Sequence, residues 1–172
     1  MDLRDGDLRL RPWTEDDVPA IVEGCNDPEI ARWIPTIPHP YTEEDARAFL
    51  RGEVTPAHEA MAIEVAGRVV GGIGMGLDSH GYRATVGYWV AAAERGNGIC
   101  TRALRLLSRH VLDDLELQRV DLLTDPGSVG SQRVAEKVGF QQEGVLRSHL
   151  RHPDGRVRDS VMYSLLPGEL LD

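Results

Sequence analysis

Apolar residues alternate with polar ones in some segments of the chain and recur every three or four residues in others. Alternation is typical of strands, whereas the longer period indicates one face of a helix. Strands are therefore expected over Leu8–Pro12, Ala60–Val65, Val69–Leu77, Tyr82–Ala91, Val120–Thr124, Phe140–Leu150 and Val157–Leu165. Helices are expected from Thr14 to about Asn26, from Thr42 to about Arg51, from Gly98 to about Leu115, and over the segment that ends at Gly139. The last two strands would pair as a hairpin across the turn Pro153-Asp154-Gly155.

A glycine-rich turn, Arg95 to Thr101, joins an expected apolar strand to the longest expected helix. Glycine lets a backbone approach a ligand closely, and the first turn of a helix offers unpaired N–H groups at the positive end of its dipole. Such a turn favours a phosphate-bearing cofactor, although glycines that only serve the turn are the alternative. Helical spacing of apolar residues supports the helix itself, at Cys100, Leu104, Leu107, Val111 and Leu115.

Two common nucleotide-binding motifs do not fit this turn. A dinucleotide fingerprint needs a third glycine where this chain has Thr101. A nucleoside-triphosphate loop needs a lysine directly after Gly98, where this chain has Ile99. The turn therefore belongs to neither nucleotide class.

The size and charge of the chain limit its partners. The 172 residues are 41% hydrophobic and 27% charged, which is ordinary for a globular protein and predicts a single domain over residues 1–172. The formal net charge of -9 argues against a nucleic-acid partner, because phosphate binding needs lysine and arginine. The same charge favours a cationic acceptor, or it only keeps the protein soluble.

The expected compartment follows from segments that the chain lacks. No apolar run is long enough to span a membrane, so no membrane partner is expected. The charged start, Met1–Asp5, lacks the apolar centre of a secretory signal. Cys25 and Cys100 show no metal-ligand spacing. We therefore expect a cytoplasmic protein with reduced thiols and no bound metal.

Two segments carry a family resemblance. Arg95-Gly96-Asn97-Gly98-Ile99-Cys100 resembles the acetyl-CoA loop of the GNAT N-acetyltransferases, Arg/Gln-x-x-Gly-x-Gly/Ala, with cysteine at the small last position. Ser128–Phe140 resembles the Asn-x-x-Ser-x-Arg-Val-x-Glu-Lys-x-Gly-Phe segment of the RimJ/RimL-like branch. Weaker similarities at Asp27–Trp33 and Glu143–Arg147 extend it over nearly the whole chain. The resemblance implies an acetyl-CoA-dependent N-acetyltransferase with an α/β (α+β) fold, namely a mixed, mainly antiparallel central sheet flanked by helices, with a splayed strand pair for acetyl-CoA.

The resemblance also assigns the cofactor contacts. In the family the strand before the loop splays from its neighbour, which here implicates Trp89, Val90 and Ala91, with the Val90 amide as candidate oxyanion donor. The pyrophosphate would bind N–H groups of the loop, so the expected cofactor residues there are Arg95, Gly96, Asn97, Gly98, Ile99, Cys100 and Thr101. Ser128 replaces the asparagine of the family motif, which keeps a good N-cap but loses an amide contact with the cofactor.

The general acid and base are less completely specified. Many family members have a tyrosine acid in the second motif, but this chain has Ala135 there. Ser131 matches the serine of the RimJ/RimL-like branch and could hydrogen-bond the CoA thiolate and relay a proton, or it could only satisfy backbone groups at the helix start. The strand 82–87 has no carboxylate to act as base. Weak substitutes are Asp78, His80 and His149.

The acceptor amine is expected beside the N-terminal helix–loop–helix unit. The substrate-binding candidates are Trp33, Tyr41 and Tyr88, with the proline-rich loop Pro35–Tyr41. Strand 69–77 has a face made of Gly72, Gly74 and Gly76, which leaves room for substrate or for a close-packed helix. The acidic residues at the next helix start either attract a cation or only complement the helix dipole; these are Glu43, Glu44 and Asp45.

The expected acceptor is the α-amine of a protein N-terminus, for instance that of a basic protein, as in RimJ/RimL-like proteins. A small-molecule amine such as an aminoglycoside is the alternative within the same reaction class. A non-catalytic acyl-CoA-binding sensor is the alternative outside it. Either a monomer or a homodimer is compatible with the sequence.

Overall fold

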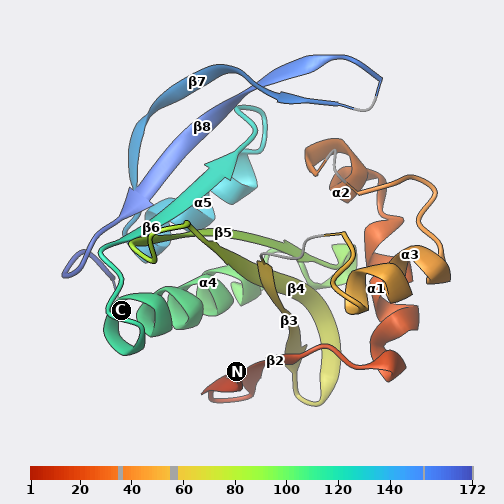
Figure 1. The fold of residues 1–172 in the computed structure, drawn as a ribbon. Helices are drawn as coiled ribbons and strands as arrows, with labels where there is room; N and C mark the ends of the chain where they lie inside the picture. The colour runs from red at the N-terminus through yellow and green to blue at the C-terminus, as the bar shows by residue number, and fades with distance from the viewer. Residues whose placement is uncertain (35–36, 55–57, 153, 172) are drawn as a thin grey trace.

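The computed structural model describes residues 1–34, 37–54, 58–152 and 154–171, which contain one mixed sheet of eight strands flanked by helices (Figure 1). The strand order across the sheet is β1-β2-β3-β4-β5-β6-β8-β7. The strands are β1 Leu3–Asp5, β2 Leu8–Pro12, β3 His58–Val65, β4 Arg68–Leu77, β5 Arg83–Val90, β6 Arg119–Thr124, β7 Gln141–Arg151 and β8 Val157–Leu165. Neighbouring strands are antiparallel except β5 and β6, which run parallel. The expected mixed, mainly antiparallel fold is confirmed.

The helices form two groups. They are η1 Glu15–Asp17, α1 Val18–Cys25, α2 Pro28–Trp33, α3 Glu43–Leu50, η2 Ala92–Glu94, α4 Ile99–Arg109, the π-helical turn η3 His110–Asp114, and α5 Val129–Val138. α4 packs against α5 and against β1, β2 and β5, whereas α1 packs against α3 and β4. In Figure 1 the α1–α3 group lies on one side of β4 and β5, and α5 lies on the other.

The larger hydrophobic core lies under α4. Leu104, Leu107 and Val111 are fully buried there, as the helical spacing predicts. The same spacing also predicts burial of Leu115, and this prediction is wrong because Leu115 is 39% exposed. The reason is the π-helical turn, in which the Leu115 amide donates to the carbonyl of His110 at 3.0 Å; the wider turn rotates Leu115 off the buried face.

The N-terminal elements differ in detail from the expectation. Thr14 precedes a 3-10 turn rather than the α-helix itself, and its backbone N–H donates to the Asp17 carboxylate at 2.8 Å. α2 was not expected, because six residues are too few to show a helical period. It begins with Pro28 and is capped by Asp27, which accepts from the Glu29 amide at 2.8 Å. The short strand β1 was likewise not expected. Pro153 of the predicted hairpin turn lies outside the described residues.

The parallel pair β5–β6 separates partway along its length. Its ladder runs from Arg83 paired with Arg119 to Val86 paired with Leu122. The ladder between β4 and β5 continues four residues further, to Gly71 paired with Val90. From residue 87 onward, β5 is therefore paired on one side only, and the expected splayed strand pair is present.

Tryptophan side chains occupy the space over Gly72 on the glycine face of β4. A Cβ added at Gly72 would lie 2.7 Å from the Trp89 indole nitrogen and 2.9 Å from Trp13. These two indoles stack with ring centroids 6.4 Å apart. Trp89 also contacts Gly24 of α1, where an added Cβ would lie 2.2 Å from the ring. Each of the two alternatives for the glycine face therefore holds in part. The indole rings join α1 to β4, and Gly72 and Gly74 also line a cavity.

Candidate active site

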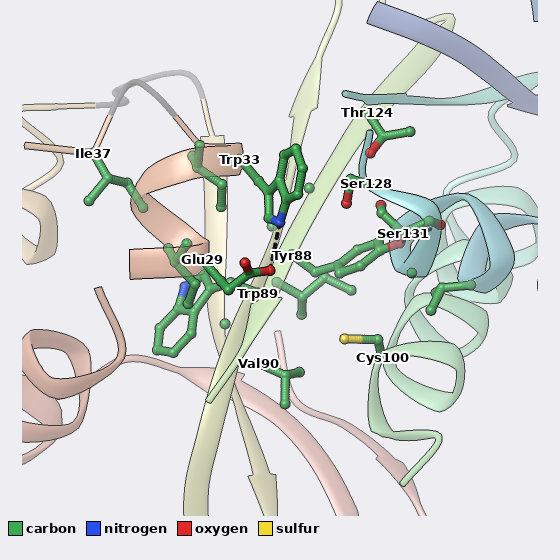
Figure 2. A pocket seen from close by; sticks show the side chains of 18 of the residues that line it. Glu29, Trp33, Ile37, Tyr88, Trp89, Val90, Cys100, Thr124, Ser128 and Ser131 are labelled. Carbon is green, nitrogen blue, oxygen red and sulfur yellow. Dashed lines mark hydrogen bonds between the residues drawn. The ribbon is translucent and has the colours of Figure 1, made fainter. Parts of the chain in front are cut away.

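A cavity of about 1180 Å³ opens where β5 separates from β6. Ligand sites in proteins typically measure about 300–1,000 Å³, so this cavity has room for a large ligand together with a second, smaller one. Figure 2 shows α2 on one side of it, β5 across the middle, and α5 with the start of α4 on the other side. The cavity therefore joins the glycine-rich loop to the α1–α3 group.

Backbone groups of β5 face the open side of the splay. The Ala91 amide donates to the Val70 carbonyl at 2.9 Å, so the odd-numbered residues here point their backbone groups toward β4. Because backbone direction alternates along a strand, the N–H groups of Tyr88 and Val90 point away from β4. Both residues follow Val86, the last residue of β5 that pairs with β6, so their N–H groups have no strand partner. Ala91 does not line the cavity. The backbone groups of Trp89 point toward β4 and its indole faces α1, so the expected cofactor contact rests on the backbone of Tyr88 and Val90 rather than on Trp89 or Ala91.

The loop before α4 presents its backbone to the cavity. Gly96 and Gly98 have left-handed φ angles of 82° and 76°, and Gly98 is the N-cap of α4. A Cβ at either glycine would meet no atom within 4 Å, so this surface is open. The first α4 residues Ile99, Cys100 and Thr101 also line the cavity, whereas Asn97 does not. An anion could reach the unpaired N–H groups of this helix start.

Arg95 holds this loop against α2. Its guanidinium forms a 2.6 Å ion pair with Asp27, the residue that caps α2, and its Nε donates to the Val90 carbonyl at 3.2 Å. Arg95 also lines the cavity. The arginine of the loop motif thus links the glycine-rich loop, β5 and α2, a structural role that the sequence alone did not indicate.

Cys100 lies inside the cavity wall as a protonated thiol. Burial raises its pKa to about 12, and the nearby Arg95 lowers it only in part. Reactive cysteines are thiolates with lowered pKa values. Cys100 therefore acts as a small apolar residue at the last position of the loop motif.

Ser131 and Tyr88 meet across the splay. Ser131 lies in the first turn of α5, and its Oγ is 3.1 Å from the Tyr88 hydroxyl. The Tyr88 hydroxyl also donates to the Ser131 carbonyl at 3.3 Å. Burial raises the pKa of Tyr88 far above its usual value, against a smaller opposing effect of the Ser131 hydrogen bond, so this phenol stays protonated. Both side chains line the cavity. The helix-start alternative for Ser131 is disfavoured, because the hydroxyl bonds to a tyrosine instead of a helix amide.

Ser128 occupies the N-cap position of α5, as expected from the motif, but its side chain makes no capping hydrogen bond. Its amide donates to the Asp125 carbonyl at 2.9 Å. The hydroxyl is thus available to the cavity that Ser128 lines.

Two basic residues of α5 were missed by the sequence reasoning. Arg133 and Lys137 both line the cavity and lie on one helix face, because they are four residues apart. Within the described part of the chain, neither has a carboxylate within ion-pair distance, unlike the nearby Arg158, which pairs with Asp125 at 3.0 Å. Their spacing in the Ser128–Phe140 motif was the available signal. They provide positive charge for phosphate groups.

The residues expected to contact the acceptor line the cavity where the structure describes them. Trp33, Tyr41, Ile37 and Pro38 line it, while Pro35 and Thr36 lie outside the described residues. Tyr41 is only 8% exposed, and its backbone is held by Asn26, which donates to the Tyr41 carbonyl at 2.8 Å. Its contact with an acceptor stays a prediction.

The acidic residues at the start of α3 have partners of their own. Glu43 pairs with Arg47 at 2.9 Å, and Glu44 pairs with Arg51 at 2.9 Å. Asp45 accepts from the Thr42 amide at 2.8 Å in a capping box. These contacts favour the helix-start role over attraction of a cation. The weak base candidates lie elsewhere, since the cavity lining does not include Asp78, His80 or His149.

Comparisons with known proteins agree with this geometry. Residues 7–141 match the family model described as "Acetyltransferase (GNAT) domain". A Bacillus subtilis (strain 168) protein named "Putative ribosomal N-acetyltransferase YdaF" is 40% identical over 93 residues, which are 54% of this chain and 50% of that relative. The match therefore spans about half the length of that curated relative.

Solved structures match over nearly the full chain. Mycobacterium smegmatis RimJ in complex with CoA-disulfide superposes with a TM-score of 0.84 and 27% identity, covering 100% of this chain and 88% of that one. A GNAT-family acetyltransferase from Bacillus anthracis gives a TM-score of 0.86 at 21% identity, covering 96% of this chain and 98% of that one, and shows the fold alone.

Among the described residues, no helix has the length and apolar character needed to cross a membrane.

Proposed function

Because this chain belongs to the GNAT acetyltransferase family, we propose that it transfers the acetyl group of acetyl-CoA to a primary amine, the α-amine of a protein N-terminus. The observation that carries the proposal is the single cavity joining the open backbone of β5, the left-handed glycine loop and the α2 wall. A thioester placed along β5 would meet an amine arriving from α2 within one cavity. We further propose that residues 1–172 act as one domain.

The cofactor half supports binding of coenzyme A. The loop Gly96–Thr101 offers helix-start N–H groups for the pyrophosphate, and Arg133 and Lys137 offer cations for phosphate. The free backbone groups of Tyr88 and Val90 are suited to the extended, amide-containing arm of the cofactor. RimJ from Mycobacterium smegmatis, which shares this fold, was solved with a CoA-disulfide.

The chemistry would rest on positioning and hydrogen bonding. The neutral amine nitrogen attacks the thioester carbonyl, which forms a C–N bond, and the oxyanion collapses as the C–S bond breaks and the thiolate leaves. The nitrogen loses one proton and the sulfur gains one, so the net transfer is from nitrogen to sulfur, with the Ser131 hydroxyl relaying a proton and recovering its own. The Val90 amide is the proposed donor to the oxyanion, since it points into the splay. Ser131, held by Tyr88, is the proposed donor to the leaving sulfur. An α-amine suits this site because its pKa of about 8 leaves part of it neutral at pH 7.

The names of the relatives and the α2 side of the cavity support the proposed acceptor. The Bacillus subtilis relative carries a ribosomal N-acetyltransferase name, and the α2 side of the cavity has the space for the end of a chain. Steady-state release of CoA thiol tests the proposal, with peptides bearing free N-termini compared with spermidine, tyramine and kanamycin. Turnover with peptides is expected. Turnover confined to the small amines would move the acceptor to that class, and CoA binding without any turnover would favour a sensor.

A further inference from the structure

Glu29 projects from α2 into the cavity, and no role was assigned to it from the sequence. Its Oε2 accepts a hydrogen bond from the Trp33 indole nitrogen at 3.1 Å, one helical turn later. Figure 2 shows the carboxylate extending from α2 toward β5, with the Trp33 ring reaching toward α5. The carboxylate is accessible rather than sequestered in the core.

The other carboxylates that line the cavity are already engaged. Glu94 pairs with Arg68 at 2.8 Å, and Asp125 pairs with Arg158 at 3.0 Å. Asp45 closes the capping box of α3. Among the cavity-lining residues that the structure describes, Glu29 is the carboxylate bound neither to a cation nor to a helix cap.

Trp33 fixes Glu29 between the two halves of the cavity. A Cβ added at Gly127 would lie 3.2 Å from the Trp33 ring, so the indole rests on the backbone that leads into α5. Ser131 follows in the first turn of that helix. The Arg32 guanidinium carbon lies 4.4 Å from the ring centroid, which further limits rotation of the indole. The Glu29 carboxylate is therefore held by a side chain that spans from α2 to the α5 loop.

Apolar side chains of the N-terminal segments, here called the apolar wall, also line this cavity. They are Trp13, Ile30, Ile34, Ile37, Phe49 and Val54. A carboxylate that shares a cavity with an apolar wall matches a primary ammonium joined to an apolar group. Pairing of the ammonium with a carboxylate gives a charge-assisted hydrogen bond, and the wall removes apolar surface from water.

Resting on the proposed acetyl transfer, we propose that Glu29 binds the ammonium of the acceptor and that the apolar wall takes the side chain of its first residue. The preferred acceptor is then an N-terminus with an apolar first residue. Trp33 is a positioning residue that orients the carboxylate. Once paired, the ammonium lies on the α2 side of the splay, opposite the α5 turn that carries Ser131, and it becomes the attacking amine when it loses one proton to solvent.

Binding of matched peptides tests this assignment. One peptide begins with leucine, a second differs only in beginning with asparagine, and a third is the leucine peptide with a hydroxyl in place of the α-amine. Each peptide is titrated calorimetrically into the protein, once without CoA and once with saturating CoA. The titration without CoA measures the role of Glu29 even if the protein does not bind CoA. The variants are Glu29→Gln, Trp33→Phe and the control Glu23→Gln, an exposed α1 carboxylate outside the cavity lining.

The wild type is expected to prefer the amine peptide over the hydroxyl peptide, and Glu29→Gln to reduce that preference about tenfold. Trp33→Phe should reduce it about threefold, because the carboxylate stays but loses its donor. Glu23→Gln should leave it unchanged. An unchanged preference in Glu29→Gln, or none in the wild type, would overturn the role of Glu29. Equal binding of the leucine and asparagine peptides would overturn the apolar wall. Failure of acetyl transfer by a wild type that binds the amine peptide as expected would instead overturn the proposed function.

Discussion

The two halves of the cavity are built in different ways. The cofactor half uses backbone, with the free edge of β5, the left-handed glycines and the first turn of α4. The acceptor half uses side chains from α2, a helix of six residues, together with those of α1 and α3. Arg95 connects the halves through its ion pair with Asp27.

The two halves therefore depend to different degrees on the identity of single side chains. Backbone N–H groups recognise a phosphate whatever side chains surround them, so the cofactor half depends on few residue identities. The acceptor half depends on the placement of single side chains such as Glu29 and Trp33. Substitutions in one half are therefore expected to leave binding in the other half intact, and the following predictions use that separation.

The largest effect is expected at Ser131. Ser131→Ala removes the proposed donor to the leaving thiolate and should lower kcat by about 10²-fold or more, with little change in CoA affinity. Stopped-flow or steady-state thiol release measures kcat, and calorimetry measures the affinity. Ser79→Ala, which removes an exposed hydroxyl outside the cavity lining, is the control. A wild-type kcat in Ser131→Ala would return this serine to a structural role.

A methyl group at Gly98 should weaken CoA binding by about tenfold or more, because it occupies the surface that the pyrophosphate approaches. Gly67→Ala is the matched control, since Gly67 has a φ of 78° against 76° at Gly98, an equally open Cβ position, and no place in the cavity. Both variants carry a left-handed strain of about 1–2 kcal/mol. Thermal unfolding should shift alike in both, while calorimetric CoA affinity falls in Gly98→Ala alone. Equal CoA affinity in the two variants would refute the loop contact.

Tyr88→Phe should lower kcat about tenfold, a smaller effect than Ser131→Ala, because the serine remains but loses its partner. Burial raises the pKa of Tyr88, so its hydroxyl stays protonated throughout the assay range and adds no titration of its own. The pH profile of kcat between about pH 6 and 9 should therefore keep its shape in the variant. Loss of the rise or the fall of kcat with pH in Tyr88→Phe would instead show that Tyr88 titrates in this range.

The smallest effect is expected at Lys137. Lys137→Gln should weaken CoA binding about fivefold at low salt, because it removes one exposed cation from the cofactor half, and the loss should shrink as salt screens the phosphate. Arg4→Gln in β1, outside the cavity lining, is the control. Calorimetric titrations of CoA at two ionic strengths measure both. A loss that does not depend on salt would argue against phosphate contact.

The sequence predicts the cofactor half better than the acceptor half for a physical reason. The alternation of β2, the glycines before α4 and the cap at Gly139 are local patterns, and each recurs in the structure. The contact of Trp33 with Gly127 joins distant segments, so no local pattern reports it. α2 is also too short to show a period, which hid Glu29 among loop residues.

Two further differences come from hydrogen bonding that composition does not reveal. The π-helical turn after α4 moves Leu115 off the buried face. The hydroxyl of Ser131 bonds to Tyr88 across the splay, so a tyrosine expected to contact the acceptor also lies beside the proposed acid. Whether Tyr88 also contacts an acceptor stays a prediction.

The central claim is that the two halves deliver an acetyl group to an α-amine, and the position of the transferred acetyl tests it most directly. The protein is incubated with acetyl-CoA and a peptide that has a leucine N-terminus and one internal lysine, and fragment mass spectrometry locates the modification. The account predicts one acetyl group on the α-amine, and none when that amine is blocked by a formyl group. Acetylation of the lysine alone, or no acetylation by a protein that binds both ligands, would contradict it.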